Sequence, residues 1–189
     1  IGEHGWFDKR FMYEESIRMP FVIKYPGKIK PKTINKDIIT NIDFAPTILE
    51  IADIDLPESI QGKSFLKNLT ENENDSWRQS MYYHYYEYPY YHHVQPHYGI
   101  RNERYKLIHF YYDIDIWELY DLKKDPNELN NLFYTDKYKY LATELKQELY
   151  ELKKQYGNKL SLDEMKEISD TDFGGLESNK GKKIQKNSN

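Results

Sequence analysis

The spacing of apolar residues along the chain changes near residue 75, from a mixed pattern to one with a period of two. In the first part, residues 21–25 combine β-branched and aromatic side chains and end at Pro26-Gly27, which predicts a short buried strand. From residue 40 or 41 onward, apolar side chains recur at helical spacing as far as residue 52, with Asn41 as the predicted N-cap. Pro46 fits this helix only near its first turn.

Beyond the acidic, asparagine-rich residues 70–75, the apolar pattern has a period of two. This pattern predicts an antiparallel meander of four short strands at residues 79–86, 98–101, 104–111 and 116–121, with a tight turn at Asn102-Glu103. Residues 138–156 then form a strongly amphipathic helix that Gly157 can end. We expect this helix to cover one face of the sheet.

These patterns divide the chain into three parts, with the acidic stretch as the first boundary. The predicted parts are residues 1–72, residues 73–157 with the sheet and its helix, and a polar tail at residues 158–189 that we expect to be mobile. The opening residues form a dense polar and aromatic loop followed at once by an apolar strand. We therefore expect residue 1 to differ from the biological start.

Composition narrows the class of protein. The 39% hydrophobic content supports a packed core, and no apolar run approaches the roughly 18 to 20 residues of a spanning helix. Cysteine is absent, which excludes disulfides and thiolate metal sites but leaves the compartment open. The net charge of -4, with both signs interspersed, argues against nucleic acid as a partner. The sequence leaves the oligomeric state open.

Tyrosine and histidine are concentrated between residues 82 and 98. The chain has 19 tyrosines, and a tyrosine-rich surface suits a ligand that combines hydroxyls with flat apolar faces, such as a sugar; strand preference explains the same bias. Three histidines, His92, His93 and His97, invite a zinc interpretation. No cysteine or carboxylate completes a tetrahedral set in this loop, so we assign no metal ligand.

The opening loop places Lys9 five residues after His4, among several carboxylates. A lysine held by carboxylates beside a histidine can act as a point charge on a phosphate or sulfate oxygen. A solvated loop with incidental charges has the same spacing. The loop alone does not decide between these two interpretations.

Four ordered motifs together resemble the C-terminal half of type I sulfatases. Residues 2–20 read GEHGWFDKRFMYEESIRMP and are followed by Tyr25-Pro26-Gly27. Residues 43–49 read DFAPTIL and residues 60–65 read IQGKSF. Finally, residues 99–108 read GIRNERYKLI, and WELYDL and DPNELNNL follow at residues 117–122 and 125–132. The resemblance spans about residues 2 to 156 and points to bacterial carbohydrate sulfatases.

This resemblance implies an α/β fold of the alkaline-phosphatase-like superfamily. Residues 1–72 would be the C-terminal end of its large α/β domain, and residues 73–157 a small antiparallel sheet with a packed helix. The implied reaction is hydrolysis of a sulfate ester on a sulfated carbohydrate. Lys9 matches the family lysine that contacts the sulfate, so we expect it to be catalytic. His4, His97 and Arg101 are expected substrate-binding residues.

The resemblance also implies groups that this chain lacks. The family nucleophile is a formylglycine made from the Cys or Ser of a C/S-x-P-S/A-R motif, and a divalent cation, usually calcium, is held with it. No such motif and no matching Asp-Asn or Asp-His pair is present. We therefore expect a fragment that is inactive alone, from a periplasmic or secreted parent. The alternatives are a phosphonate or phosphate monoesterase of the same superfamily, or a non-catalytic carbohydrate-binding module.

Overall fold

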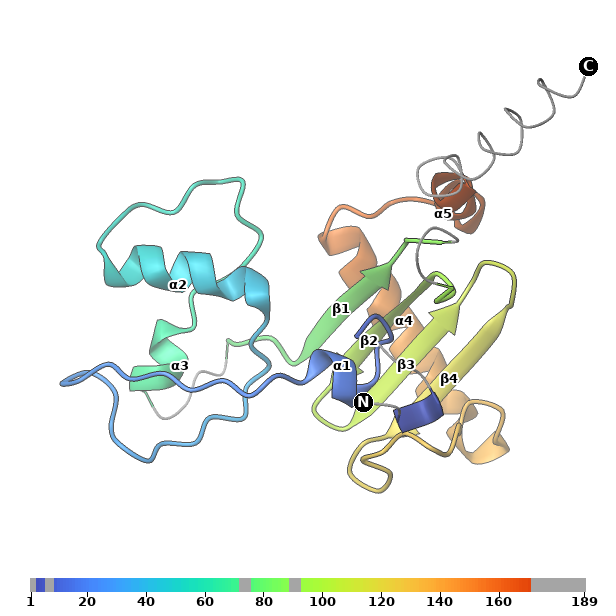
Figure 1. Ribbon diagram of the computed structural model, residues 1–189, viewed down its shortest axis with the longest axis horizontal. Coiled ribbons are helices and arrows are strands. Elements are labelled where there is room, and N and C mark those ends of the chain that lie inside the picture. The colour runs from blue at the N-terminus through green and yellow to red at the C-terminus, as the bar shows by residue number, and fades with distance from the viewer. Residues whose placement is uncertain (1–2, 6–8, 72–75, 89–92, 171–189) are drawn as a thin grey trace, which may run out of the picture. The chain divides into compact units, whose positions relative to one another are not determined.

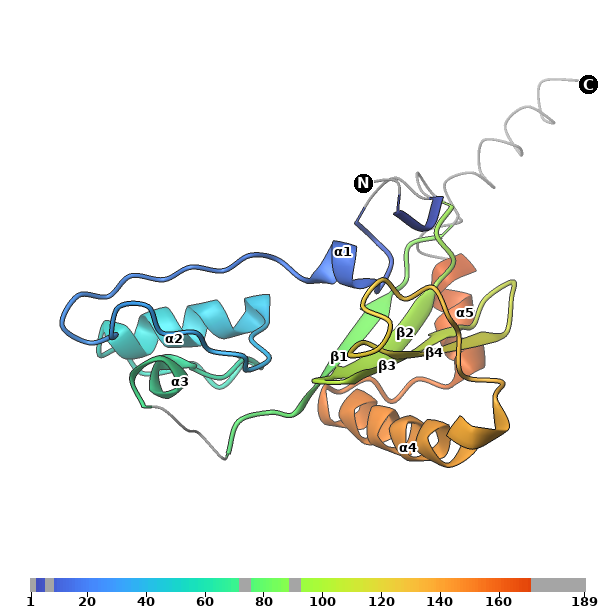
Figure 2. The same cartoon turned by 90° about the horizontal axis from the view of Figure 1, so that it is seen from below.

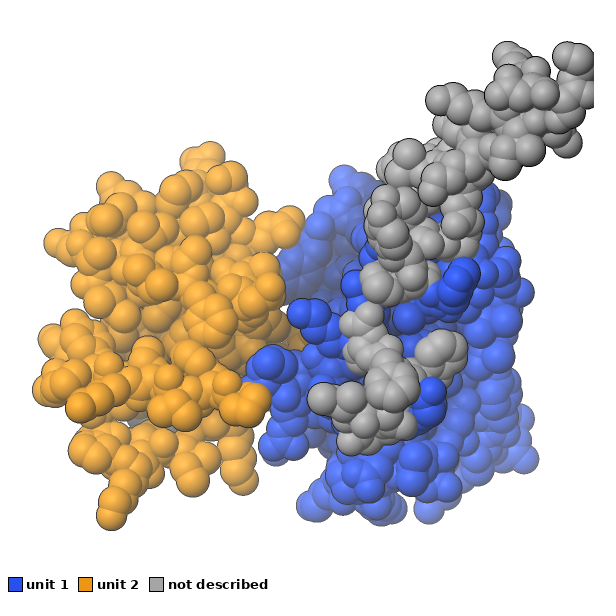
Figure 3. Space-filling model, viewed as in Figure 1, with its two compact units in different colours: residues 1–19, 82–189 blue, residues 20–81 orange. Residues whose placement is uncertain are grey.

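The computed structural model describes residues 3–5, 9–71, 76–88 and 93–170. The chain forms two compact units, one of residues 1–19 with 82–189 and the other of residues 20–81, coloured separately in Figure 3. The predicted three-part division, with boundaries after residues 72 and 157, remains a prediction.

A four-stranded sheet forms the centre of the first unit (Figure 1). Its order is β1-β2-β3-β4, and the β2–β3 and β3–β4 pairs are antiparallel. The sequence-based prediction of a four-stranded meander is confirmed. The strands are β1 (Ser80–Tyr85), β2 (His97–Asn102), β3 (Tyr105–Phe110) and β4 (Ile116–Asp121).

The turn between β2 and β3 is held by Asn102. Its side-chain oxygen accepts hydrogen bonds from the backbone N–H groups of Arg104 (3.0 Å) and Tyr105 (2.7 Å). An Asx turn of this kind explains why asparagine stands at the end of β2. It fixes the register in which Arg101 lies opposite Lys106.

Helix α4 (Lys139–Gln155) covers one face of the sheet, as its amphipathic pattern predicts (Figure 2). Short helix η3 (Asp136–Tyr138) precedes it, and Gly157 follows it with φ of 79°. Alternate strand residues pack against the helix because side chains alternate between the two faces of a strand. The buried residues of this core are Tyr98, Ile100, Leu107, Tyr111, Leu119, Ala142, Leu145, Leu149 and Met165.

One helix lies where the sequence predicted a mobile tail. Helix α5 (Leu162–Ile168) begins at Ser161, whose hydroxyl accepts from the backbone N–H of Glu164. The Glu164 side chain in turn accepts from the Ser161 backbone, which completes a capping box. Met165 is fully buried in the core. The prediction was wrong for this stretch because low apolar content concealed the cap and a single buried anchor. Residues 171–189 lie outside the described residues.

Within its described residues, the second unit contains three short helices: η2 (Asn41–Asp43), α2 (Phe44–Ile51) and α3 (Leu66–Thr70). The predicted helix is confirmed, with Pro46 in its first turn, but Thr40 rather than Asn41 precedes η2 as the cap. The Thr40 backbone and hydroxyl both donate to the Asp43 carboxylate at 2.8 Å. Helix α3 was not predicted.

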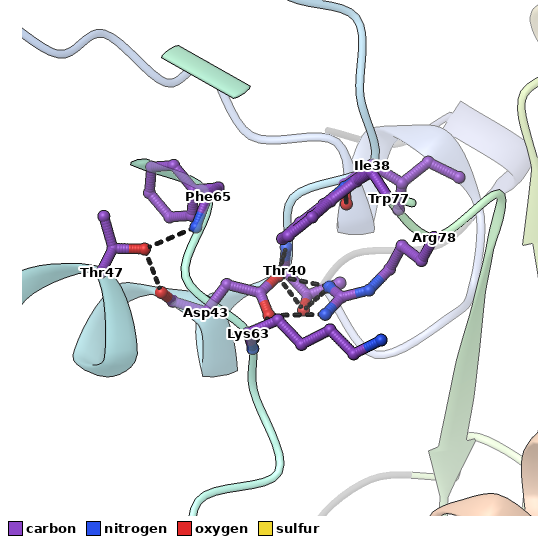
Figure 4. A network of polar contacts seen from close by, with 8 residues as sticks. All are labelled: Ile38, Thr40, Asp43, Thr47, Lys63, Phe65, Trp77 and Arg78. Carbon is purple, nitrogen blue, oxygen red and sulfur yellow. Dashed lines mark hydrogen bonds and ion pairs between the residues drawn. The ribbon is translucent and has the colours of Figure 1, made fainter. Parts of the chain in front are cut away.

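Asp43 is the centre of a polar network that fixes this unit (Figure 4). Its buried carboxylate receives both terminal nitrogens of the Arg78 guanidinium, one of them at 2.7 Å, and the backbone N–H of Lys63 at 3.0 Å. Thr47 donates its hydroxyl to the Asp43 carbonyl and accepts from the backbone of Phe65. The DFAPTIL and IQGKSF motifs are thus joined to each other by hydrogen bonds, and their polar residues serve the fold.

The strand predicted at residues 21–25 is absent. These residues adopt no regular structure, and Val22 is 92% exposed. A strand needs a neighbour to satisfy its backbone N–H and C=O groups. Up to residue 79, the described part of the second unit contains no strand, so it offers residues 21–25 no neighbouring strand to pair with.

Candidate functional site

The segment that carries His4 and Lys9 lies on the face of the sheet opposite α4 (Figure 2). We call residues 3–19 the opening segment; residues 6–8 of it lie outside the described residues. It contains helices η1 (Glu3–Gly5) and α1 (Glu14–Ile17). Phe11 and Met12 are buried against the sheet, together with Ile108, Phe110 and Tyr120. These apolar contacts fix the middle of the opening segment.

Strand alternation determines which side chains face the opening segment. The residues on this face of the sheet are His97, Gly99 and Arg101 on β2, Lys106, Ile108 and Phe110 on β3, and Glu118 and Tyr120 on β4. This face therefore mixes apolar and charged residues, whereas the α4 face is largely apolar. The charged residues are the ones that engage the opening segment.

Glu14 connects the opening segment to two cations of the sheet. Its carboxylate lies 2.9 Å from Lys106 Nζ and accepts from the Arg101 guanidinium at 3.2 Å and 3.3 Å. Its backbone N–H donates to Glu128 Oε2 at 2.6 Å. Burial tends to raise the pKa of Glu14, but Lys106 and Arg101 outweigh burial and lower it. Glu14 is therefore ionised at neutral pH.

A second carboxylate, Glu118 of β4, binds the phenol of the residue before Glu14. Tyr13 and Tyr120 both donate to Glu118 Oε2 at 3.0 Å. Burial raises the pKa of Glu118, although the two phenol hydrogen bonds counteract the increase. The hydrogen bond to Glu118 orients Tyr13, whose ring packs against the ring of His4.

His4 stacks on the ring of Tyr13, with centroids 4.1 Å apart and planes within 8°. Its Nε2 lies 3.8 Å from a carboxylate oxygen of Glu15. The backbone of His4 has φ of 56°, in the left-handed region that non-glycine residues seldom adopt. The histidine is thus held by packing on an oriented tyrosine.

Lys9 is exposed to solvent at the edge of this arrangement, two residues before the buried Phe11. The sequence-based roles of Lys9, His4, His97 and Arg101 remain predictions. His4 belongs to the opening segment that also carries Lys9, and His97 and Arg101 of β2 contact this segment through Phe11 and Glu14.

His97 is fully buried, which differs from the solvent-facing position that a substrate contact implies. Its Nδ1–H donates to the Gln95 carbonyl at 2.8 Å, and its ring packs against Phe11 and Phe110. Burial lowers the pKa of His97 to about 4, so the ring is neutral at pH 7. His97 thus contacts residues of the protein interior. The neighbouring His92 lies outside the described residues.

The sequence did not lead to two residues of the site, Lys106 on this face of β3 and Glu128 in a loop. Lys106 is in phase with Ile108 and Phe110 on β3, so alternation already placed a charge among apolar residues. A buried charge requires a partner, and that requirement was the available signal. Glu128 could not be identified in this way because it lies in a loop.

No group of three or more His, Asp or Glu side chains in the described residues is arranged to hold a metal ion. The described residues therefore do not fit the calcium that the family resemblance implies. No helix in the part of the chain that the structure describes has the length and apolar character needed to cross a membrane.

Comparison with known proteins gives a consistent result. The family model for the C-terminal region of N-sulphoglucosamine sulphohydrolase matches residues 2–155. An N-acetylglucosamine-6-O-sulfatase of Bacteroides thetaiotaomicron is 55% identical over 159 residues, which is 82% of this chain and 28% of the relative. An arylsulfatase of Clostridium perfringens is 34% identical over 176 residues, which is 85% of this chain and 34% of the relative.

The fold comparison agrees. The solved structure of BT4656 in complex with its substrate, D-glucosamine-2-N,6-O-disulfate, superposes with a TM-score of 0.81 at 52% identity. The match covers 84% of this chain and 32% of that one. This chain thus spans about a third of the length of the relatives that it matches.

Proposed function

Because this chain belongs to the sulfatase family and matches the C-terminal portion of its members, we propose that it is part of an enzyme that hydrolyses sulfate esters of a carbohydrate. The observation that carries the proposal is the anchored opening segment. It retains Lys9, the residue that matches the family's sulfate-contacting lysine, on a backbone fixed by Met12 and Glu14.

In this proposal, Lys9 stabilises the sulfuryl group during cleavage of the S–O bond. Negative charge stays on three sulfuryl oxygens and grows on the leaving oxygen, so a fixed cation beside them lowers the barrier. An ammonium suits this task because it is a compact point charge with three donors. His4, which stacks on Tyr13 within the opening segment, and Arg101, which binds Glu14 of that segment, are the proposed substrate-binding residues.

The proposed substrate class is a glucosamine sulfated at O6. This choice follows the activity of the Bacteroides thetaiotaomicron relative, an N-acetylglucosamine-6-O-sulfatase, and the ligand in the BT4656 structure. A sugar of this kind offers hydroxyls to donors and an apolar ring face to aromatic side chains. The tyrosine-rich strand β1 is the proposed source of those aromatic contacts.

We further infer that this chain needs additional protein to be active. The sequence contains no cysteine and no serine in the motif that yields formylglycine. Helix α2 exposes apolar side chains, including Ile48 at 64% and, to a lesser degree, Phe44 and Ile51. An exposed apolar face on a helix favours packing against further protein. The remainder of a sulfatase domain would cover α2 and supply both the nucleophile and the metal ligands.

A chimera tests the proposal directly. Residues 2–155 would replace the matching region of the 55% identical relative, and release of sulfate from N-acetylglucosamine 6-sulfate would be measured. The proposal expects a folded chimera that releases sulfate, while this chain alone releases none. A folded chimera that cleaves a phosphonate monoester but no sulfate ester would instead support the alternative monoesterase function.

A further inference from the structure

Lys106 and Glu128 form an ion pair that the proposed chemistry does not use. Lys106 Nζ lies 2.7 Å from Glu128 Oε1, and both side chains are completely buried. Glu128 adopts φ of 53°, an uncommon conformation for a glutamate. The presence of a buried ion pair, one member of which has a strained backbone, requires a physical reason.

Stability alone does not supply that reason. Removing two charges from water costs several kcal/mol per ion, and well-packed apolar residues often replace a buried pair without loss. The neighbours of Lys106 on its face include Ile108 and Phe110, so an apolar side chain would suit position 106. A buried pair can, however, select one arrangement of the segments that it joins.

The arrangement that this pair selects is that of the opening segment. Lys106 binds the Glu14 carboxylate at 2.9 Å, while Glu128 accepts from the Glu14 backbone N–H at 2.6 Å. Glu14 is therefore held at both its side chain and its backbone. An apolar residue at position 106 would keep the sheet packed but would leave this grip incomplete.

Glu14 belongs to three consecutive anchored residues that lead back to Lys9. Met12 is fully buried and Tyr13 donates to Glu118. A fixed backbone at residues 12–14 limits where the ammonium of Lys9 can reach. A displacement of about 1 Å at a catalytic group can cost on the order of 10²-fold in rate, so this restriction bears on catalysis.

We propose that Lys106, acting through Glu14 and Glu128, is the positioning residue that sets the location of the sulfate-binding opening segment. The inference rests on the proposed function for its catalytic meaning. Lys106 itself touches no substrate in this account. Arg101 also binds Glu14, but its side chain is 20% exposed and its contacts are longer, so it contributes less.

Amide hydrogen exchange of the full 189-residue chain tests the positioning role without substrate. In Lys106→Met, exchange over residues 10–18 should become at least about tenfold faster, while exchange at Leu107 and Leu145 changes less than about twofold. Lys153→Met is the matched control, because Lys153 is a buried lysine on α4 that donates to the Leu160 carbonyl. It should leave residues 10–18 at the wild-type rate.

The double variant Lys106→Met with Glu128→Gln separates positioning from stability. It leaves no unpaired charge at position 128 and keeps an oxygen for the Glu14 N–H. The proposal expects core exchange at the wild-type rate and fast exchange over residues 10–18. Wild-type rates in both regions, or fast exchange in both, would overturn it, as would unchanged exchange over residues 10–18 in the single variant.

The chimera adds a kinetic measurement that keeps the two proposals distinguishable. Lys106→Met should lower kcat/KM for the 6-sulfate at least about tenfold in a folded chimera, and Lys153→Met less than about twofold. If the wild-type chimera releases no sulfate, the proposed function fails, and the exchange result still decides the positioning role. If the chimera is active and Lys106→Met matches wild type, the positioning role fails alone.

Discussion

The sulfur of Met12 occupies the space directly above Gly99 on β2. A Cβ built at Gly99 would lie 2.6 Å from that sulfur and closer still to the carbonyl oxygen of Leu107. Real Cβ atoms essentially never show such contacts, so a larger residue at position 99 would force Met12 and the Leu107 backbone to shift. The opening segment and the sheet are therefore fitted to each other at the residue level.

Substitution of Gly99 should destabilise the unit that contains the sheet. Gly99→Ala is expected to lower the free energy of unfolding by about 1 to 3 kcal/mol, because the added methyl group overpacks the core. Urea unfolding measures this change. Measured within a Met12→Ala background, the same substitution should recover only part of this loss, since the Leu107 carbonyl remains in the way. Full recovery would show that the sulfur alone restricts this position.

The buried, neutral His97 predicts a specific pH dependence. Burial lowers its folded-state pKa to about 4, whereas the unfolded chain takes up a proton near pH 6.5. Its contribution to stability is therefore complete above pH 6.5 and is lost as the pH falls toward 4. His97→Phe removes this loss.

The difference in unfolding free energy between His97→Phe and wild type tests that dependence. Between pH 7 and pH 4 the variant should gain about 3 kcal/mol relative to wild type, at about 1.4 kcal/mol per unit of pKa change. Unfolding curves collected across this range provide the measurement. A constant difference at every pH would contradict the buried, neutral state of His97.

In the second unit, Asp43 should be the most sensitive charged residue. Asp43→Ala leaves the largely buried guanidinium of Arg78 without its partner, which typically costs about 3 to 5 kcal/mol. Asp55→Ala is the control, because Asp55 is exposed and its loss should change stability by less than about 0.5 kcal/mol. Urea unfolding followed at the amides of α2 compares them. Equal effects would contradict the structural role of the network.

The exposed apolar face of α2 yields a prediction about the longer enzyme. In this chain alone, Ile48→Lys should change stability by less than about 0.5 kcal/mol, because the side chain faces solvent. In the chimera the same change should greatly reduce soluble, active protein, because it would bury an unpaired charge. Leu129→Lys, at a residue 69% exposed in the other unit, should be tolerated in both. Tolerance of Ile48→Lys in the chimera would contradict coverage of α2.

The strands and the long helix could be predicted from the sequence because their patterns arise from local burial. The run of apolar and aromatic side chains in residues 105–110, which is buried on both faces of the strand, and the leucine stripe of α4 each indicate burial. The sequence of α5 also carried a usable signal, the Ser161 and Glu164 capping box. Residues 21–25 show the opposite case, since strand propensity there meets no hydrogen-bonding partner within the described residues.

The candidate site was less predictable because its supports are distant in sequence. Lys106 forms ion pairs with both Glu14 and Glu128. These two glutamates are far apart in the sequence, and no local pattern connects them. Family resemblance led to the prediction of Lys9, which is exposed, but it offers no reason for the fixed backbone at Met12 and Glu14. That reason lies in long-range contacts that only the folded chain contains.

The most direct test of the sulfatase account is Lys9→Ala in the chimera, with sulfate release from N-acetylglucosamine 6-sulfate as the readout. The account predicts a fall in kcat of about 10² to 10³-fold, because a fixed cation beside the sulfuryl oxygens is lost. Lys154→Ala, at an exposed lysine of α4, should leave the rate unchanged. A folded Lys9→Ala chimera that retains more than about a tenth of the wild-type rate would contradict the assigned role of Lys9.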